Sequence, residues 1–324
     1  MKAFVTGATG FIGGRVAARL RDRGDDVVAL VRSPDRAGDL AGMGCALVEG
    51  DLDDDRAIRQ GLEGADACFH VAGDYRLGLP KADCEEMRKT NVEGTRGVLK
   101  AAHDTGVART VYVSTVGVFG NTRRKVVDET YRRDEGEGFL TCYDETKYRA
   151  HLVAEEFIAD GDPVIIAMPG GVYGPGDHSG LGTLIDLARR GRMKLAPFGD
   201  LGITAAHVDD IAAGIVATHD RGRPGEAYVL AGPAVTQMEI ARCVTGLAGK
   251  KPPAGNVPPL LIKMAIPFGP VVGRMLGLQP NLRELIRGAD GVTYWAKADK
   301  AGRELGWKAR DLETGLKETL AAAS

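Results

Sequence analysis

Short apolar runs alternate with helical patterns through the first half of the chain. Several runs, such as the one at 27–31, are apolar on both faces of an extended strand, which requires helices above and below the sheet that they form. The intervening segments space their apolar residues as amphipathic helices do. This rhythm predicts an α/β fold with a doubly wound parallel sheet. The expected strands are 3–6, 27–31, 46–48, 67–71, 111–114 and 164–167, and the expected helices are 12–23, 57–61, 92–103 and 145–158.

The texture of the sequence changes after about residue 170. The regular alternation ends where glycine and proline cluster, at 169–182, 224–225, 232–233 and 251–259. A further βα-like piece at 205–218, followed by an apolar run at 227–230, indicates a return to the sheet. A chain of 324 residues also exceeds what one compact core usually supports. We therefore expect a sheet domain at 1–168 plus about 204–232, and a smaller, discontinuous C-terminal substrate domain at about 169–203 and 233–324.

Composition and charge narrow the class of partner. A hydrophobic fraction of 44%, a charged fraction of 27% and a net charge of -2 are ordinary for a globular protein and give no reason to expect nucleic acid as a partner. The N-terminus shows no cleavable signal pattern. The cysteines have no metal-ligand spacing, and their odd number does not indicate a disulfide framework, so we expect no metal site and a reducing, cytoplasmic location. They are Cys45, Cys68, Cys84, Cys142 and Cys243.

One apolar stretch, at 258–278, approaches membrane-spanning length. Lys263, Arg274 and internal prolines and glycines interrupt it. We interpret the stretch as a buried or substrate-facing helical segment and expect no stable membrane insertion. Attachment at a membrane interface is the alternative interpretation.

The first predicted strand runs into a glycine-rich turn and then into a helix. The turn reads Gly7-Ala8-Thr9-Gly10-Phe11-Ile12-Gly13. Glycines there let a pyrophosphate approach the backbone closely and lie at the positive N-terminus of the helix, where free N–H groups point at it. At the first strand-to-helix turn of a parallel sheet, this pattern indicates a dinucleotide site.

The glycine spacing GxxGxxG, with Asp51-Leu52 after the third strand, resembles the extended short-chain dehydrogenase/reductase superfamily, which includes the NAD-dependent epimerase/dehydratase family. Further matching motifs follow in the family's order along nearly the whole chain: HVA at 70–72, NVEGT at 91–95, VST at 113–115, YDETK at 143–147, PGGVYGPG at 169–176, HVDD at 207–210 and KAGRELGW at 300–307. The resemblance implies a Rossmann-type fold. It also implies a nicotinamide dinucleotide held by Gly7, Thr9, Gly10, Phe11, Ile12, Gly13, Arg32, Asp51, Leu52, Val71, Ala72, Gly73, Asn91, Tyr143, Lys147, Pro169, Gly170 and Val172.

The end of the second strand bears on which dinucleotide binds. An acidic residue there would hydrogen-bond the ribose 2′-hydroxyl of NAD, whereas a basic residue favours the 2′-phosphate of NADP. The strand ends in Val31-Arg32-Ser33-Pro34, and the nearby Asp25 and Asp26 precede it. This stretch also resembles the largely NADPH-using dihydroflavonol reductase-like branch. We expect NADP(H) to be favoured over NAD(H), with Arg32 as its ligand; the alternative is that Arg32 is a solvent-exposed loop cation.

Tyr143 and Lys147 are one helical turn apart, so on a helix they share a face. The resemblance places them against the nicotinamide, together with Thr115, as catalytic residues. A tyrosine is a usable acid but a poor base at neutral pH, and a nearby lysine cation should lower its pKa. We expect Tyr143 to protonate the substrate oxygen and Thr115, helped by Ser114, to hydrogen-bond that oxygen. Lys147 should also bind the ribose hydroxyls.

Two features that are usual in nucleotide-sugar enzymes of this superfamily are missing. Those enzymes carry an asparagine before Val-Tyr-Gly-Pro and an arginine shortly before His-Val-Asp-Asp, whereas this chain reads MPGGVYGPG and GITAAHVDD. A buried diphosphate without cationic partners would be costly. The segment at 70–77 instead resembles dihydroflavonol reductase-like proteins of the hopanoid-associated epimerase-like branch.

We therefore expect an NADPH-dependent oxidoreductase that acts on a ketone, an aldehyde or the corresponding secondary alcohol of a small hydrophobic molecule. One alternative is a nucleotide-sugar epimerase or dehydratase that holds its diphosphate through Arg189, Arg190 or Lys194. Another is a non-enzymatic NADPH sensor. We interpret His70 as a strand-end residue lining the cofactor cleft and His207 as a structural residue, because neither has a partner at metal-ligand spacing. A homodimer through the helices at 92–103 and 145–158 is expected.

Overall fold

The computed structural model describes residues 1–258, 261, 264 and 281–322. Its larger sheet has seven parallel strands in the order β3–β2–β1–β4–β5–β6–β9. The strand order reverses between β1 and β4, and such a switch point opens a crevice at the carboxyl ends of the strands. The predicted Rossmann-type sheet is confirmed. The strands are β1 (Lys2–Thr6), β2 (Asp26–Val31), β3 (Ala46–Glu49), β4 (Ala67–His70), β5 (Arg109–Val113), β6 (Val164–Pro169) and β9 (Ala227–Leu230).

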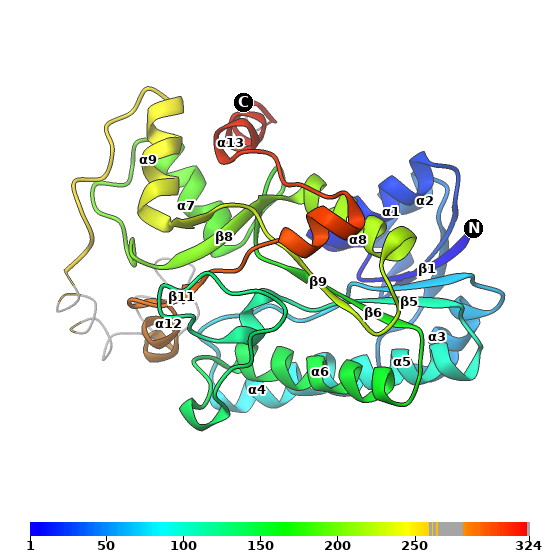
Figure 1. The fold of residues 1–324 in the computed structure, drawn as a ribbon. Helices are drawn as coiled ribbons and strands as arrows, with labels where there is room; N and C mark the ends of the chain where they lie inside the picture. Colours follow the sequence, from blue (N-terminus) through cyan, green and yellow to red (C-terminus); the bar gives the residue numbers. More distant parts are fainter. Residues whose placement is uncertain (259–260, 262–263, 265–280, 323–324) are drawn as a thin grey trace.

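Helices cover both faces of this sheet (Figure 1). One layer contains α1 (Phe11–Asp22), α2 (Gly38–Gly42) and α8 (Val208–Arg221), and α1 packs against α8. The opposite layer contains α3 (Asp55–Leu62), α4 (Lys81–Arg88), α5 (Gly94–Asp104) and α6 (Cys142–Ala159), and α5 packs against both α3 and α6. This double cover is the reason that the strands are apolar on both faces.

Alternate residues of β1 belong to different layers of the core. Ala3 and Val5 pack in the cluster that contains Leu20 of α1, whereas Phe4 packs with Ile58 of α3. Phe4 is fully buried. Burying a side chain of that size stabilises the fold by roughly 2 kcal/mol. The strand is thus held from both sides, which fixes the loop that follows it.

A smaller sheet surrounds β8 (Gly202–His207). β8 pairs in parallel with β7 (Gly171–Tyr173) and β11 (Thr293–Tyr294), and antiparallel with β10 (Ala234–Thr236). Helices α7 (Gly180–Arg189), α9 (Gln237–Leu247) and α13 (Leu312–Ala322) pack near this sheet, and α12 (Leu282–Ala289) precedes β11. Thr236 and Glu239 form a capping box that starts α9, since each side chain accepts a hydrogen bond from the other's backbone N–H.

Two segments pack with a different part of the structure than the predicted domain boundaries imply. Of the piece at 204–232, β9 returns to the larger sheet, but β8 belongs to the smaller one. The C-terminal segment around Trp307 packs in the core beside α8, although the sequence analysis assigned it to the substrate domain. The Trp307 indole donates to the Asp210 carbonyl at 2.7 Å. It fits there because Gly214 of α8 has no side chain to occupy the space.

Cys84 and Cys142 form a disulfide bond, which corrects the expectation of unpaired cysteines. The two residues are 58 positions apart and meet because α4 packs against α6. A pair that only tertiary packing brings together leaves no motif in the sequence.

Within the described part of the chain, no group of histidine, cysteine or acidic residues could hold a metal ion, and none of the helices combines the length and apolar character needed to span a bilayer. The segment at 258–278, for which we predicted a buried or substrate-facing helix, lies almost entirely outside the described residues.

Candidate active site

The turn after β1 forms a tight cradle at the N-terminus of α1. Gly7 has a φ of +73°, and a Cβ at this position would lie 2.7 Å from the backbone of Ala72. A Cβ on Gly13 would lie 2.1 Å from the carbonyl oxygen of Gly7. The left-handed backbone and the close approach of the next loop therefore require glycine at the first position, and helix-to-loop packing requires it at the last.

This cradle presents backbone donors that the protein itself does not use. α1 begins at Phe11, and among the described residues no side chain caps its N-terminus. The Gly14 N–H donates to the Gly10 carbonyl at 2.9 Å, so the N–H groups of the three residues between them point out of the helix. Free donors at the positive end of a helix fit a pyrophosphate. The residues present therefore fit the diphosphate of a dinucleotide.

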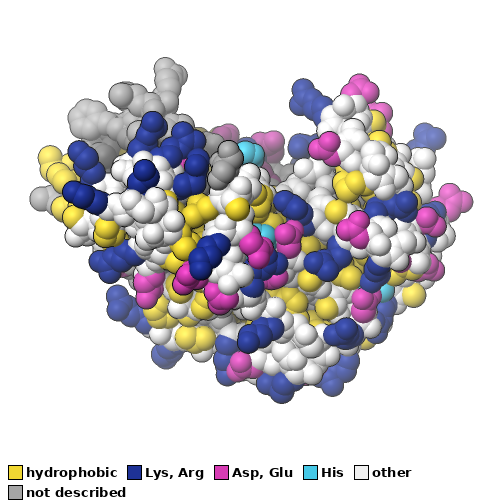
Figure 2. Space-filling model, turned by 90° about the horizontal axis from the view of Figure 1, so that it is seen from above, with side chains coloured by type: hydrophobic (Ala, Val, Ile, Leu, Met, Phe, Trp, Pro, Cys, Tyr) yellow, Lys and Arg dark blue, Asp and Glu magenta, His cyan; other side chains and the backbone are white. Residues whose placement is uncertain are grey.

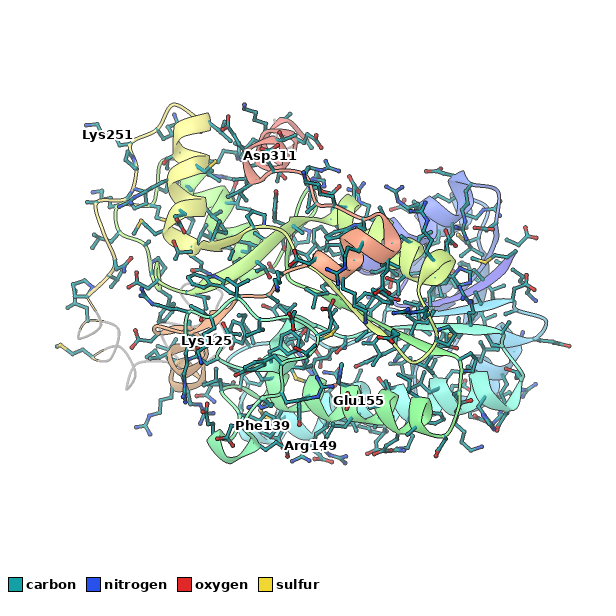
Figure 3. The ribbon with its side chains drawn as sticks, in the orientation of Figure 1. Lys125, Phe139, Arg149, Glu155, Lys251 and Asp311 are labelled. Atoms are coloured by element: carbon teal, nitrogen blue, oxygen red, sulfur yellow. A yellow bond between two sulfur atoms is a disulfide. The ribbon has the colours of Figure 1, made fainter. Side chains whose placement is uncertain are left out.

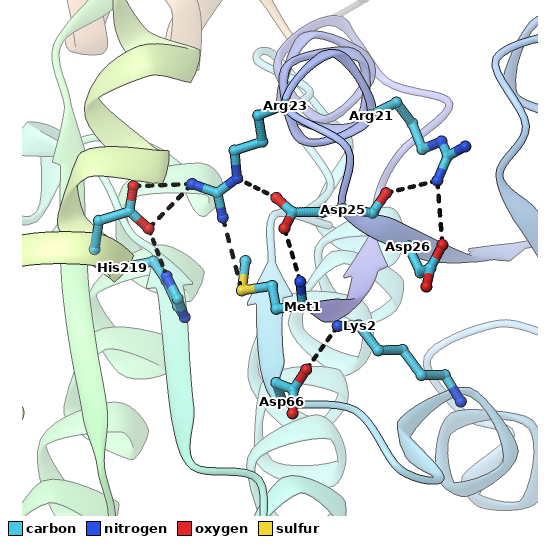
Figure 4. Close-up of polar contacts among 9 residues, drawn as sticks. Met1, Lys2, Arg21, Arg23, Asp25, Asp26, Asp66 and His219 are labelled. Carbon is cyan, nitrogen blue, oxygen red and sulfur yellow. Dashed lines mark hydrogen bonds and ion pairs between the residues drawn. The ribbon is translucent and has the colours of Figure 1, made fainter.

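The two ends of β2 carry opposite charges. Arg32 is exposed at the carboxyl end, on the same edge of the sheet as the glycine turn. At the amino end, Asp25 accepts a hydrogen bond from the N-terminal amine of Met1 at 3.0 Å and also pairs with Arg23 (Figure 4). Asp26 begins β2 at that same end. Both acids therefore lie on the edge opposite the cradle, too far away to contact a ribose there.

Other predicted cofactor residues follow strands at the carboxyl edge. Asp51, after β3, is exposed and accepts a hydrogen bond from the Asp53 N–H at 2.9 Å, while Leu52 packs under α5. The loop at 71–73 follows β4. Gly170, at the end of β6, lets β8 approach closely, since a Cβ there would lie 2.2 Å from the Thr204 carbonyl oxygen. The structure thus gathers these residues along one edge.

Asn91 holds the loop after β4 against α6. Its Oδ1 accepts from the Asp74 N–H at 2.7 Å, and its Nδ2 donates to the Asp74 carbonyl and to Thr146 Oγ1, each at 3.0 Å. It lies in the π-helical turn Lys89–Glu93 between α4 and α5, a feature often found at functional sites. Because its amide is buried and engaged within the protein, Asn91 holds this loop in place. Its contact with the cofactor stays a prediction.

Tyr143, Lys147 and Thr115 meet at the end of β5. Thr141 starts α6 by accepting a hydrogen bond from the Asp144 N–H at 3.0 Å, which places Tyr143 and Lys147 on the first two turns. The side chains of Tyr143 and Thr115 lie close together, and Thr115 acts against the rise that burial causes in the pKa of Tyr143. Lys147 Nζ donates to the Val113 carbonyl at 2.9 Å and to the Tyr112 hydroxyl at 3.2 Å.

Burial sets the protonation of this group. It raises the pKa of Tyr143, and Tyr75 and Asp144 act in the same direction. It lowers the pKa of Lys147 to about 8. The pKa of Tyr143 is therefore not lowered overall, contrary to the prediction: the ammonium is directed at β5, and the loss of hydration around the phenol dominates. At neutral pH Tyr143 is an uncharged hydroxyl that can act as an acid.

Ser114 faces away from Tyr143. Successive side chains of an extended segment point to opposite sides, so Ser114 and Thr115 diverge at the end of β5. Ser114 is buried, and its Oγ lies 2.9 Å from His151 Nδ1. The prediction that Ser114 helps Thr115 to bind the substrate oxygen is thus corrected.

Three residues near Tyr143 were not predicted as site residues. Tyr75 packs edge-on against Tyr143, with ring centroids 4.7 Å apart, although 53% of Tyr75 is exposed. Asp144 is buried and accepts a hydrogen bond from the Tyr294 hydroxyl at 3.3 Å, and burial raises its pKa to about 6. The segment at 70–77 could have directed attention to Tyr75. No local pattern connects Asp144 with a residue 150 positions later.

His70 and His207, the histidines of two motifs that match the family, are both buried. His70 is fully buried between the hydroxyls of Thr6 and Thr95, at 2.8 and 3.0 Å, and burial lowers its pKa to about 3. It therefore supports the strand ends from within. The expectation that His70 lines the cofactor crevice is wrong, because its side chain is fully buried. His207 accepts a hydrogen bond from the Asp209 N–H at 3.3 Å and starts α8, in agreement with a structural role.

The cations suggested for a sugar diphosphate have other partners or lie elsewhere. Arg189 and Arg190 both pair with Asp186 on α7, at 2.9 and 2.8 Å. Lys194 is exposed beyond the end of α7. Charges of both signs are mixed across the face shown in Figure 2, which offers no broad basic patch for a polyanion.

The model of the NAD dependent epimerase/dehydratase family matches residues 3–231. The chain belongs to this family. A protein of Synechocystis sp. provisionally named dihydroflavonol 4-reductase is 31% identical, with 99% of this chain and 92% of that protein covered. The 4-hydroxy-2-methyl-3-oxo-4-farnesyl-3,4-dihydroquinoline-1-oxide ketoreductase of Stigmatella aurantiaca is 30% identical, with 96% and 92% covered.

The solved structure of MoeE5 in complex with UDP-glucose and NAD has 25% identity and a TM-score of 0.78, with 100% of this chain and 98% of that chain covered. The resemblance to extended short-chain dehydrogenases/reductases is thereby confirmed. This family member is an NAD(P)-dependent oxidoreductase whose relatives include both ketoreductases and sugar-nucleotide enzymes.

Proposed function

We propose that the protein uses NADPH to reduce the carbonyl group of a small hydrophobic ketone or aldehyde, or oxidises the corresponding secondary alcohol. The observation that carries the proposal is that Tyr143, Lys147 and Thr115 come together at the carboxyl edge of the sheet, beside the dinucleotide cradle, with Tyr143 uncharged. When bound, the reduced nicotinamide supplies the hydride.

The protein's own groups would handle the substrate oxygen. Thr115 Oγ accepts a hydrogen bond from the Gly117 N–H at 3.1 Å, which leaves the hydroxyl proton of Thr115 free to donate to a carbonyl oxygen. Tyr143 donates its proton to the same oxygen as negative charge develops there. Lys147, still protonated at pH 7 because its pKa is about 8, stabilises the phenolate that Tyr143 becomes.

The surroundings of Tyr143 favour an apolar substrate. The exposed ring of Tyr75 provides an aromatic surface directly against Tyr143. Aromatic walls with a few polar groups are typical of small-molecule pockets. The Stigmatella relative acts, by its name, on a farnesylated quinoline oxide, which is a ketone of this apolar kind.

Arg32 supports NADPH as the preferred cofactor. It is exposed at the carboxyl end of β2, where the adenosine ribose of a dinucleotide in the cradle would lie. A guanidinium can bind a 2′-phosphate through two parallel hydrogen bonds, whereas NADH offers only a hydroxyl.

The second candidate is a nucleotide-sugar epimerase or dehydratase, which the structural likeness to MoeE5 supports. The two arginines considered for its diphosphate, Arg189 and Arg190, are committed to Asp186, which leaves the diphosphate without these cationic partners. A non-enzymatic sensor is disfavoured because the chain keeps both Tyr143 and Lys147.

The test is NADPH and NADH oxidation by the purified protein against hydrophobic ketones and aldehydes, with nucleotide sugars assayed in parallel for conversion without net cofactor turnover. We expect carbonyl reduction with NADPH, and a loss of at least about 100-fold in kcat for Tyr143→Phe. Tyr148→Phe is the matched control, since Tyr148 is on the same helix but bonds Glu135. If the protein binds cofactor, reduces no carbonyl and converts a nucleotide sugar, the second candidate replaces the first.

A further inference from the structure

A stripe of ionisable residues on α6 continues beyond the catalytic pair. Tyr143, Lys147, His151 and Glu155 follow one another at intervals of four residues. A helix turns about 100° per residue, so each step of four moves about 40° around the axis. The stripe therefore starts at the active site and drifts to the outer side of α6, where the Glu155 side chain is 44% exposed (Figure 3).

Hydroxyl groups of β5 connect the members of this stripe. Lys147 Nζ donates to the Tyr112 hydroxyl at 3.2 Å, and that hydroxyl lies near the hydroxyls of Thr95 and Ser114. Ser114 Oγ lies 2.9 Å from His151 Nδ1, and His151 Nε2 lies 3.6 Å from the Glu155 carboxylate. Tyr112, Ser114 and Lys147 are at most 5% exposed. The inner part of this path is thus shielded from solvent.

The outer end of the path opens into a cavity of about 970 Å³. His151 and Glu155 line it together with charged residues such as Arg132, Glu226 and Lys300, whereas Tyr143 and Lys147 do not. A cavity of this size with charged side chains in its lining holds water. His151 therefore stands between cavity water on one side and a buried chain of hydroxyls leading to Lys147 on the other.

We propose that Lys147, Tyr112, Ser114 and His151 form a proton path that reloads the active site from this cavity. The inference rests on the proposed function. After Tyr143 has protonated the substrate oxygen, its phenolate takes a proton from the Lys147 ammonium one turn along α6. Lys147 recovers a proton from Tyr112, Tyr112 from Ser114, and Ser114 from His151 Nδ1, while cavity water protonates His151 Nε2.

The protons balance along this path. One proton enters at Nε2 for each proton that leaves on the product, and rotation of the hydroxyls and tautomer exchange through cavity water restore the starting arrangement. Burial raises the pKa of Tyr112, so its hydroxyl passes the proton in a concerted step and holds no charge. A lysine with a pKa of about 8 can both give and regain a proton near neutral pH.

A hydrolase triad does not explain the same three side chains. In a Ser–His–acid triad the imidazole presents Nε2 to the serine and Nδ1 to the acid. Here Nδ1 faces Ser114 and Nε2 faces Glu155. Ser114 is 5% exposed and does not line the cavity, so a scissile bond could not reach its hydroxyl.

Variants of the path test its function in the full-length enzyme. His151→Gln keeps a hydrogen bond to Ser114 but cannot relay a proton, and we expect kcat to fall by about 10- to 100-fold with Tm unchanged. His151→Ala should lose as much and regain it with added imidazole, which can enter through the cavity. Tyr112→Phe should lose as much kcat, and added imidazole should not restore it, because this substitution breaks the path deeper inside the protein. The control is His103→Ala, an exposed histidine paired with Asp162. Wild-type kcat in His151→Gln, or an unrescued loss in His151→Ala, overturns the proposal.

Nitrogen NMR of the histidine rings in the cofactor-free protein separates this inference from the proposed function. Tyr112→Phe does not touch His151, but it should shift the Nδ1 resonance by breaking the chain that passes through Ser114, as Ser114→Ala should do directly. If the His151 Nδ1 resonance is unchanged in Tyr112→Phe, the hydroxyl groups do not connect Tyr112 with His151. That result overturns the proton path, whatever the substrate. Shifts in both variants together with a wild type that reduces no carbonyl would retain the path and reject the proposed function.

Discussion

Charged side chains are paired at the amino end of the larger sheet, whereas at its carboxyl end burial disfavours their charged forms. At the amino end, Arg23 pairs with Asp25 and with Asp220, the latter at 2.9 Å (Figure 4). Although burial opposes it, hydrogen bonds from Arg23 and the N-terminal amine lower the pKa of Asp25. At the carboxyl end, burial pushes Lys147 and Asp144 toward their neutral forms.

The comparison separates charges that hold the fold from charges that the chemistry needs. A paired charge is stabilised by folding, whereas a buried charge without an opposite partner is destabilised by it. Neutral substitutions should therefore act in opposite directions at the two ends. At the carboxyl end, removing a buried charge should raise stability, with loss of function where the charge takes part in the chemistry, as at Lys147. At the amino end, removing a paired charge should lower stability and leave function intact.

The largest effect is expected from Lys147→Met. We predict a fall of about 1,000-fold in kcat, since the group that stabilises the Tyr143 phenolate is lost. At pH 7 the variant should nevertheless be more stable by about 2 kcal/mol. Removing a charge whose pKa is depressed from 10.5 to about 8 recovers about 3 kcal/mol, and the lost hydrogen bonds offset about 1 kcal/mol of that gain. Steady-state kinetics and urea unfolding measure the two effects.

The stability difference between Lys147→Met and wild type should change with pH in a direction that the pKa of Lys147 determines. The unfolded chain holds the Lys147 proton up to about pH 10.5, and the folded protein releases it at about pH 8, so wild-type stability rises through that window. The advantage of Lys147→Met should shrink from pH 8 upward. The exposed Lys100, paired with Asp104 at 2.7 Å, provides the control variant Lys100→Met, which should change little at any pH. A destabilised Lys147→Met would contradict the comparison.

Asp144→Asn should give the next largest effect, on stability alone. The Asp144 carboxyl has a folded pKa of about 6 against 3.8 in the unfolded chain, because it is buried. Between those values the folded protein holds the proton more tightly, so wild-type stability falls as pH rises. The advantage of Asp144→Asn should grow from near zero at pH 4 to about 3 kcal/mol at pH 7.

Urea unfolding at both pH values checks the Asp144 prediction. Glu145→Gln is the neighbouring control, because the Glu145 side chain is 44% exposed and pairs with Arg149 at 3.0 Å. A constant difference between Asp144→Asn and wild type across this range would show that the carboxyl is not held neutral by burial.

Much of the larger sheet was predictable from sequence, for a physical reason. Strands covered on both faces must be apolar throughout, so an uninterrupted apolar run in the sequence marks each of them, as in β2 and β6. The smaller sheet was not predicted, because β7 and β11 are so short that neighbouring strands, chiefly β8, determine their conformation. The place of Trp307 depends on a gap at Gly214, which no local pattern records.

The candidate site was predictable in its motif residues but not in its pairings. Tyr143, Lys147 and Thr115 stand at spacings that the backbone geometry brings together. Which group Lys147 faces depends on the Tyr112 hydroxyl across β5, and the direction of Ser114 depends on His151. Such pairings, like the Cys84–Cys142 bond, arise only when α6 packs on the sheet and on α4.

Arg32→Ala tests an exposed charge at the carboxyl edge. Because a guanidinium–phosphate pair contributes roughly 1.5–3 kcal/mol, KM for NADPH should rise about 10- to 100-fold, with KM for NADH changed less than about twofold. Stability should not change, since Arg32 is exposed. Equal losses with both cofactors would remove the basis for NADPH preference. Arg36→Ala, an exposed arginine a few residues later, is the control.

The smallest effect is expected at the amino end, from Arg23→Met. Its side chain is 31% exposed, so the pairs with Asp25 and Asp220 should contribute only about 1 kcal/mol, or a fall of about 2 °C in Tm. The length of the strands separates this end of the sheet from Tyr143, so kcat should stay within about twofold of wild type. Asp220→Asn combined with Arg23→Met should destabilise less than the sum of the two single changes, because the same pair is removed twice. A fall in kcat without a fall in Tm would mean that this ion-pair cluster acts on the active site, and the division between structural and functional charges would then fail.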